Sequence, residues 1–170
     1  MLNFGIIGCG RIATRHSDLL GGNEIENACL KAVCDIDISK AKKIGSKFNV
    51  SFYDDFHEMM QKETLDVVVI LTESGNHPKH FLELAKYKKH IVVEKPMALR
   101  IQDAEKMIEA AKSNKFRFFV VKQNRFNVPV RKMRQAIEAE EFGKLFLGTV
   151  RVRWCRTQEY YDLAEWRGTW

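Results

Sequence analysis

The sequence predicts an α/β protein of the Rossmann type: a doubly wound parallel sheet followed by the start of a second, α+β domain. Short apolar runs alternate with helical patterns through residues 1–123 of the 170-residue chain, with short connections between them. One run is a continuous stretch of β-branched residues, which is typical of a strand buried on both faces. A glycine-rich turn follows the first run, as in dinucleotide-binding sheets.

Six apolar runs are expected as strands and five helical patterns as the helices between them. The expected strands are residues 3–7, 28–34, 50–53, 66–71, 90–93 and 116–121. The first helix is expected to run from the glycine-rich turn to Leu20 and to stop at Gly21 and Gly22. The other helices, with apolar residues at helical spacing, are expected at 39–48, 56–60, 76–88 and 101–113. This alternation favours parallel strands with helices on both faces.

The pattern changes near Asn124, and we expect a second domain over residues 124–170. Residues 128–141 predict a helix with three apolar side chains facing inward: Val130, Met133 and Ile137. Residues 145–154 alternate between apolar and polar, which predicts a half-exposed strand of a different sheet. These elements are too few for a core of their own. The strand is therefore expected to pair with further residues or another copy, and the full-length protein to form a homo-oligomer.

Composition indicates which classes of binding partner and which cellular location to expect. The formal net charge is +6, but the basic residues lie beside acidic ones without a nucleic-acid-binding motif, so no nucleic-acid partner is expected. No apolar run approaches the roughly 20 residues that span a bilayer. The chain begins directly with a strand, so we expect no membrane partner and a cytoplasmic location. The cysteines lack metal-site spacing, so we expect no metal and buried free thiols at Cys9, Cys29, Cys34 and Cys155.

Residues 8–13 match the dinucleotide-binding pattern G-x-G-x-x-G/A between a strand and a helix. Gly8 permits the tight turn, Gly10 lets the backbone approach a diphosphate, and Ala13 allows close packing of helix on strand. The helix N-terminus attracts the phosphates. Arg11 and Ile12, in the first turn of the helix, lie within reach of the same ligand.

Asp35 ends the second expected strand, about 20 residues after the glycine turn. A carboxylate at this position accepts hydrogen bonds from the adenosine ribose hydroxyls and repels a 2′-phosphate, which predicts NAD rather than NADP as the cofactor. The alternative, that the carboxylate only caps the next helix, fits Asp37 better because it lies closer to the helix start.

Two further strand ends carry polar residues where a doubly wound sheet binds its ligands. The triplet Glu94-Lys95-Pro96 follows the fifth strand, and five polar residues follow the fourth: Thr72, Glu73, Ser74, Asn76 and His77. With this triplet between a strand and a helix, the chain resembles the Gfo/Idh/MocA family of sugar and polyol dehydrogenases. Segments 121–127 and 166–170 resemble the branch that oxidises UDP-N-acetylglucosaminuronic acid at C3 for bacterial surface polysaccharides.

The resemblance implies a role for each matching position. Lys95 would be the catalytic residue, with substrate contacts from Lys95, Asn124 and Arg125. The cofactor would be contacted by the residues Thr72, Ser74, His77, Glu94, Lys95, Gln123, Trp166 and Arg167. The sequence departs from the family at Glu73, where proline is common, and this departure bears on the shape of the loop.

The chemistry of alcohol oxidation also points to Lys95, because removing a hydride and a proton needs a positioned base or polarising cation. Two other positions keep structural alternatives: His77 could satisfy nearby backbone, and Trp166 could pack between domains. The family usually supplies a second acid–base histidine from its second domain, and no segment matches it. The chain alone is therefore expected to be inactive.

These observations predict an NAD-dependent dehydrogenase that transfers a hydride from a sugar secondary hydroxyl to NAD. The expected substrate is a small molecule, a sugar or sugar nucleotide. Two alternatives stay open: a dehydrogenase of a free sugar or inositol, and a non-catalytic NAD-binding module.

Overall fold

The computed structural model describes residues 1–164 and 166–168. The chain divides into two compact units, Met1–Val121 and Lys122–Trp170. Among the described residues, no helix combines the length and the apolar character needed to cross a membrane.

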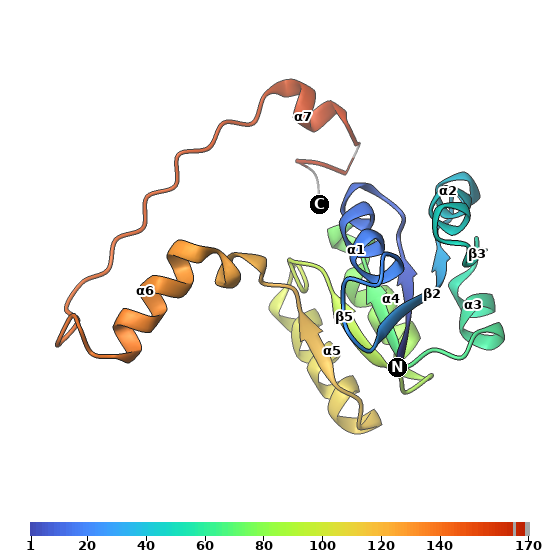
Figure 1. Ribbon diagram of the computed structural model, residues 1–170, viewed down its shortest axis with the longest axis horizontal. Coiled ribbons are helices and arrows are strands. Elements are labelled where there is room, and N and C mark those ends of the chain that lie inside the picture. The colour runs from blue at the N-terminus through green and yellow to red at the C-terminus, as the bar shows by residue number, and fades with distance from the viewer. Residues whose placement is uncertain (165, 169–170) are drawn as a thin grey trace. The chain divides into compact units, whose positions relative to one another are not determined.

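The first unit is built on one six-stranded parallel sheet (Figure 1). The strand order is β3-β2-β1-β4-β5-β6, so the chain starts in the middle of the sheet, extends it to one side, and then crosses back to extend it to the other. The strands are β1 Leu2–Ile7, β2 Ala28–Cys34, β3 Ser51–Tyr53, β4 Val67–Ile70, β5 His90–Val93 and β6 Phe118–Val120. This arrangement confirms the predicted doubly wound sheet, and its switch point lies between β1 and β4.

Helices cover both faces of this sheet. Their bounds are α1 Arg11–Gly21, α2 Ile38–Phe48, α3 Phe56–Lys62, α4 His77–Ala85 and α5 Ile101–Asn114. Residues of α1 and α2 share one buried cluster, whereas residues of α3, α4 and α5 share the other. Within β4, Val69 joins the first cluster, and Val68 and Ile70 join the second. Burial on both faces explains why β4 has a continuous apolar sequence.

An extra residue in β2 sets which face its last residues present. Phe4 of β1 lies opposite Leu30, but the next residue of β1, Gly5, lies opposite Ala32, so Lys31 is left over as a bulge. Leu30 and Val33 therefore belong to one cluster while Ala32 belongs to the other. A β-bulge reverses the alternation of side chains in this way. It also determines how Asp35, just after β2, approaches β1.

The second unit contains the 3₁₀ helix η2 Gln123–Phe126 and the helices α6 Val128–Glu138 and α7 Gln158–Asp162. The helix is present, but its expected inward face is wrong for two of three residues: Val130 is partly buried, whereas Met133 and Ile137 are 53% and 42% exposed. The predicted strand over 145–154 is also wrong, since 145–157 has no regular structure. A strand is held by hydrogen bonds to a neighbour, and no neighbour pairs with this segment in the described residues.

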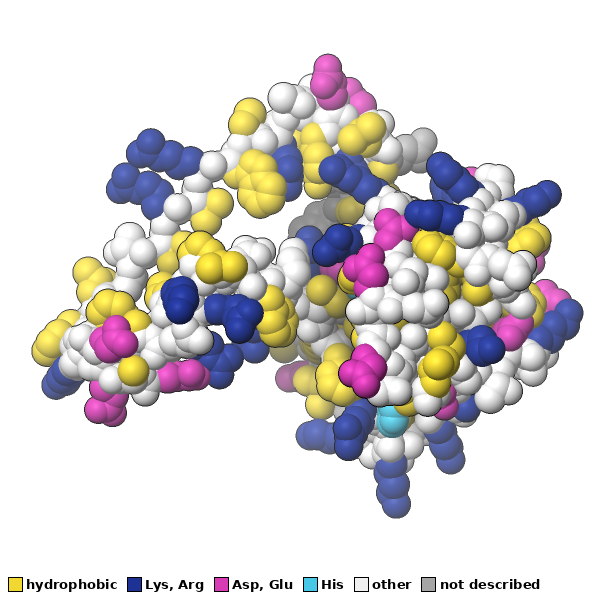
Figure 2. Space-filling model, in the orientation of Figure 1, with side chains coloured by type: hydrophobic (Ala, Val, Ile, Leu, Met, Phe, Trp, Pro, Cys, Tyr) yellow, Lys and Arg dark blue, Asp and Glu magenta, His cyan; other side chains and the backbone are white. Residues whose placement is uncertain are grey.

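The four cysteines are free thiols, and two of them, Cys9 and Cys34, are buried. Cys29 is partly buried and Cys155 is exposed, so the expectation of burial is wrong for Cys155. On the visible face of the Met1–Val121 unit, Figure 2 shows Lys and Arg side chains interspersed with Asp and Glu. Mixed charge of this kind is typical of a solvated surface.

Candidate functional site

The glycine turn after β1 is fixed by the neighbouring strands. The Gly8 N–H donates to the carbonyl of Cys34 at the end of β2, over 2.8 Å. Gly8 has φ +93°, and a Cβ there would lie 2.7 Å from backbone atoms of Leu71 and Thr72. A side chain is therefore excluded by both the backbone conformation and the space. The fold itself requires glycine at this position.

Gly10 is different, because nothing in the protein requires it to be glycine. It precedes α1 with extended backbone angles that other residues adopt, φ −76° and ψ −164°, and a Cβ built there meets no atom within 4 Å. No side chain caps α1, and its first turn carries no acidic residue. The first N–H groups of a helix need an acceptor and carry partial positive charge. This open, uncapped end of α1 fits a diphosphate.

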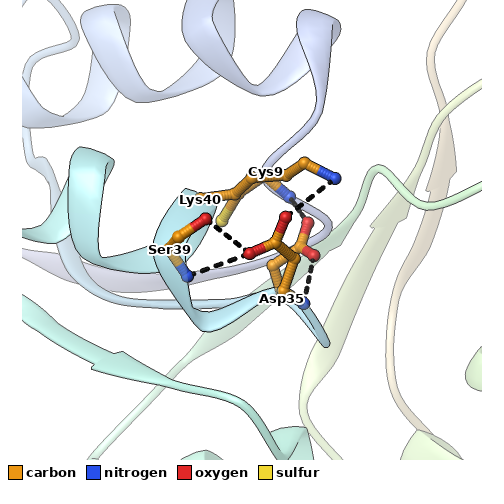
Figure 3. A network of polar contacts seen from close by, with 5 residues as sticks. Cys9, Asp35, Ser39 and Lys40 are labelled. Carbon is orange, nitrogen blue, oxygen red and sulfur yellow. Dashed lines mark hydrogen bonds and ion pairs between the residues drawn. The ribbon is translucent and has the colours of Figure 1, made fainter.

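Asp35 lies directly against the glycine turn (Figure 3). Its Oδ2 accepts from the N–H of Cys9 at 2.6 Å, and its Oδ1 accepts from the N–H of Asp37 at 2.9 Å. Each carboxylate oxygen has a second lone pair for a ribose hydroxyl. Asp37 caps α2 through the N–H of Ser39, 3.1 Å away, as the sequence predicts. Asp35 is thus held in place by the turn that would hold the diphosphate.

The two thiols beside this turn are unsuited to nucleophilic chemistry. Burial raises the pKa of Cys9 to about 12, with a further contribution from Asp35. Burial likewise raises the pKa of Cys34 to about 12, assisted by Asp55 and Asp35. A nucleophilic cysteine needs a thiolate, so both residues act here as small apolar side chains.

The turn after β5 combines an exposed lysine with a buried carboxylate. The Lys95 side chain is exposed, whereas Glu94 is only 7% exposed. Glu94 Oε1 lies 3.3 Å from His16 Nε2 of α1, and its Oε2 accepts the N–H of Lys95 at 2.9 Å. Burial raises the pKa of Glu94, but the hydrogen bonds from His16 and the Lys95 N–H outweigh burial and lower the pKa overall.

This lowered pKa predicts how Glu94 contributes to stability as pH changes. A carboxylate whose pKa is lower in the folded state stabilises fully above its unfolded value, here 4.5, and loses this effect as pH falls through the folded value. The difference in unfolding free energy between the wild type and Glu94→Gln should therefore be constant above about pH 5 and shrink below it. Urea unfolding from pH 6 to pH 3 measures it, with the exposed Glu105→Gln as control. A difference that grows towards acid would contradict the assignment.

His77 is buried at the start of α4, with 1% exposure. Its Nδ1 lies 2.8 Å from the carbonyl oxygen of Pro96, and its Nε2 lies 2.9 Å from that of Thr72. Both ring nitrogens thus face backbone, so the imidazole joins the loop after β4 to the turn after β5. This geometry favours the structural alternative for His77 over direct contact with a ribose.

The loop after β4 is ordered by local contacts. Ser74, Gly75 and Asn76 form the short 3₁₀ helix η1, Ser74–Asn76, and the Asn76 side chain donates to Glu73, which is exposed. Thr72 Oγ1 lies 2.9 Å from His80 Nδ1. Burial lowers the pKa of His80, which favours its neutral form. In residues 1–164 and 166–168, no three His, Cys, Asp or Glu side chains are grouped closely enough to hold a metal.

The remaining predicted site residues belong to the second unit. Gln123, Asn124 and Arg125 are exposed in η2. Arg167 donates from Nη1 to the carbonyl of Tyr160 at 2.7 Å, and its guanidinium stacks 4.4 Å from the Tyr160 ring centre. Trp166, 41% exposed, lies beside it in sequence. Their roles toward cofactor or substrate stay predictions.

Comparison with known proteins identifies the family of this chain. Residues 2–122 match the model of the oxidoreductase family with an NAD-binding Rossmann fold, Gfo/Idh/MocA. The chain belongs to this family. Myo-inositol 2-dehydrogenase of Thermotoga maritima is 31% identical over 144 residues, which are 84% of this chain and 42% of that protein. The family's cofactor, NAD, fits the open helix end at Gly10 and the held carboxylate of Asp35.

Two solved dehydrogenase structures are similar over nearly the whole chain. The WlbA dehydrogenase of Bordetella pertussis, in complex with NADH and UDP-GlcNAcA, superposes with a TM-score of 0.92 at 36% identity, over 98% of this chain and 51% of that one. The WlbA dehydrogenase of Chromobacterium violaceum, with the same ligands, gives 0.93 at 38% identity, over 99% and 49%. The chain therefore spans about half the length of these relatives.

In the first unit, the structure brings predicted residues together in two places. The glycine turn contacts Asp35, and the loop after β4 is joined to the turn that carries Lys95. Sequence reasoning assigned no role in the site to His16. Its position in the second turn of α1, the helix that follows the glycine pattern, was the available signal, but only the structure shows its contact with Glu94.

Proposed function

We propose that this chain is the NAD-binding part of a dehydrogenase that oxidises the C3 hydroxyl of UDP-N-acetylglucosaminuronic acid. The observation that carries the proposal is the likeness to two WlbA dehydrogenases, whose structures contain NADH and UDP-GlcNAcA. That likeness covers 98% and 99% of the chain, against 84% for the inositol dehydrogenase. The segments after residue 121 that resemble this branch support the same substrate.

In this proposal the first unit holds the cofactor. Gly8, Gly10 and the N-terminus of α1 bind the diphosphate, with Arg11 and Ile12 in the first turn beside it. The Asp35 carboxylate accepts hydrogen bonds from the hydroxyls of the adenosine ribose. Thr72, Ser74 and Glu94 are proposed to contact the nicotinamide end of the cofactor. Gln123, Trp166 and Arg167 of the second unit are proposed to contact the cofactor as well.

Lys95 is the group proposed to act on the substrate. When bound, NAD supplies the acceptor for the hydride. The exposed Nζ of Lys95 orients the C3 hydroxyl by a hydrogen bond and, as the neutral amine, accepts the proton of that hydroxyl while the hydride leaves and the carbonyl forms. Asn124 and Arg125 are proposed to contact the same substrate.

A substrate panel on the complete protein tests the proposal. The expected result is reduction of NAD with UDP-N-acetylglucosaminuronic acid and little with free sugars or inositol. Inositol is the second candidate substrate, because the chain is 31% identical to an inositol dehydrogenase. Turnover of inositol alone would replace the proposed substrate, and NAD binding without turnover of any sugar would favour a non-catalytic module.

Asp35 is expected to set the choice between NAD and NADP. Asp35→Ser removes the carboxylate that would repel a 2′-phosphate, so the ratio of NADH to NADPH affinity should fall by about tenfold or more. Asp35→Arg should lower it further. The matched control is Asp37→Ser, which keeps a good helix cap and should leave the preference unchanged. Fluorescence titration with both reduced cofactors measures the ratios, and an unchanged ratio in Asp35→Ser would remove Asp35 from the site.

A further inference from the structure

The residues on either side of Lys95 are anchored, although its own side chain is exposed. Before it, Glu94 is 7% exposed and directs its two carboxylate oxygens at His16 and at the Lys95 N–H. After it, the carbonyl oxygen of Pro96 lies 2.8 Å from the buried His77. The backbone that carries Lys95 is therefore held from α1 on one side and from α4 on the other.

The link to α1 depends on His16. The lowered pKa of Glu94 keeps it ionised and able only to accept hydrogen bonds. His16 Nε2 must therefore be the donor across the 3.3 Å contact. The imidazole is itself shielded, with its side chain 21% exposed. A hydrogen bond to an ionised carboxylate is charge-assisted, so this contact favours one orientation of the Glu94 side chain.

Glu94 passes this orientation to Lys95. Its second oxygen accepts the N–H of Lys95 at 2.9 Å, so a rotation of the carboxylate would break that bond or the bond to His16. Because α1 begins at the glycine turn, the chain of contacts His16–Glu94–Lys95 connects the helix at the diphosphate with the turn at the reacting end of the cofactor.

We propose that His16 is a positioning residue, which fixes the carboxylate of Glu94 and through it the backbone of Lys95. The proposal rests on the proposed function for its kinetic consequence, since it assigns Lys95 to the reaction. The structural part of the proposal, that Glu94 restrains the Lys95 N–H, does not depend on which substrate is bound.

The test compares three variants of the complete protein. His16→Ala removes the donor to Glu94, and His16→Gln returns a neutral N–H donor of similar reach. His90→Ala is the control, because His90 is at the opposite end of β5 and accepts from the N–H of Arg117 instead. Two quantities are measured: the steady-state constants for sugar oxidation, and the hydrogen exchange rate of the peptide segment that contains the Lys95 N–H.

His16→Ala is expected to lower kcat by about 10²-fold, the loss typical of a small misplacement of a reacting group, while the KM for NAD changes less than about threefold. Exchange of the Lys95 segment should be faster. The kcat of His16→Gln should be at least about tenfold higher than that of His16→Ala. The kcat and the exchange rate of His90→Ala should match those of the wild type. A kcat within about twofold of wild type in His16→Ala, with unchanged exchange, would overturn the proposal.

The exchange measurement separates this inference from the proposed function. If the wild type turns over none of the sugars, the proposed function fails, and the positioning role is judged by exchange alone. Faster exchange in His16→Ala, but not in His90→Ala, then supports the restraint. Equal exchange in all the variants overturns it.

Discussion

Replacing Lys95 with alanine is expected to lower kcat of the complete protein by about 10²–10⁴-fold, the range that a positioned acid–base group contributes. The affinity for NAD should change less than about threefold, because the glycine turn and Asp35 follow β1 and β2, away from the turn after β5. The Lys95 side chain is exposed, so its removal leaves no cavity and the fold should be retained. Steady-state kinetics and a cofactor titration measure the two effects.

The control for this prediction is Lys112→Ala, which removes another exposed lysine from the last turn of α5. It should leave kcat and the affinity for NAD as in the wild type. Near-normal turnover in Lys95→Ala would exclude Lys95 from the chemistry. Loss of NAD binding together with turnover would instead assign Lys95 to the binding of the cofactor.

Alanine at Gly8 and alanine at Gly10 are expected to fail in different ways. Gly8→Ala places a Cβ 2.7 Å from the backbone of the Leu71–Thr72 peptide at φ +93°. It should therefore lower the unfolding free energy by about 2 kcal/mol or more. Gly10→Ala meets no protein atom within 4 Å, so it should cost less than about 1 kcal/mol. Its methyl group would instead lie where the diphosphate approaches the backbone, and the affinity for NADH should fall by about tenfold or more.

Urea unfolding and an NADH titration of both variants separate these effects. Gly143→Ala controls for the general cost of alanine at positive φ, since it has φ +60° but no neighbour within 4 Å of an added Cβ. It should be less destabilising than Gly8→Ala and should not change the affinity for NADH. If Gly10→Ala bound NADH normally, the diphosphate would not lie at this helix end.

Local patterns were sufficient to predict the sheet and the position of its glycine turn. The glycine turn is a short-range motif with a steric cause, visible in the clash that a Cβ at Gly8 would make. Asp35 was predictable because a strand of known length brings its end beside that turn. The continuous apolar run of β4 indicated burial on both faces, and Val69 and Val68 do face different clusters.

Features that depend on distant partners could not be predicted in the same way. The bulge at Lys31 depends on the register between β1 and β2, which alternation alone does not reveal. The contact of His16 with Glu94 joins residues far apart in sequence. The pattern over 145–154 was interpreted as a strand, but a strand also needs a partner, and none pairs with it in the described residues. The same limit applies to α6, which has no fully buried residue in the structure as described.

Calorimetric titration of the folded 170-residue chain with NADH tests the central claim most directly. The claim is that the glycine turn, the open end of α1 and Asp35 together hold a dinucleotide. The expected result is a single site with heat of binding for NADH, weaker binding of NADPH, and loss of most of the signal in Gly10→Ala. A well-folded chain that gives no heat with NADH or with NAD would contradict it.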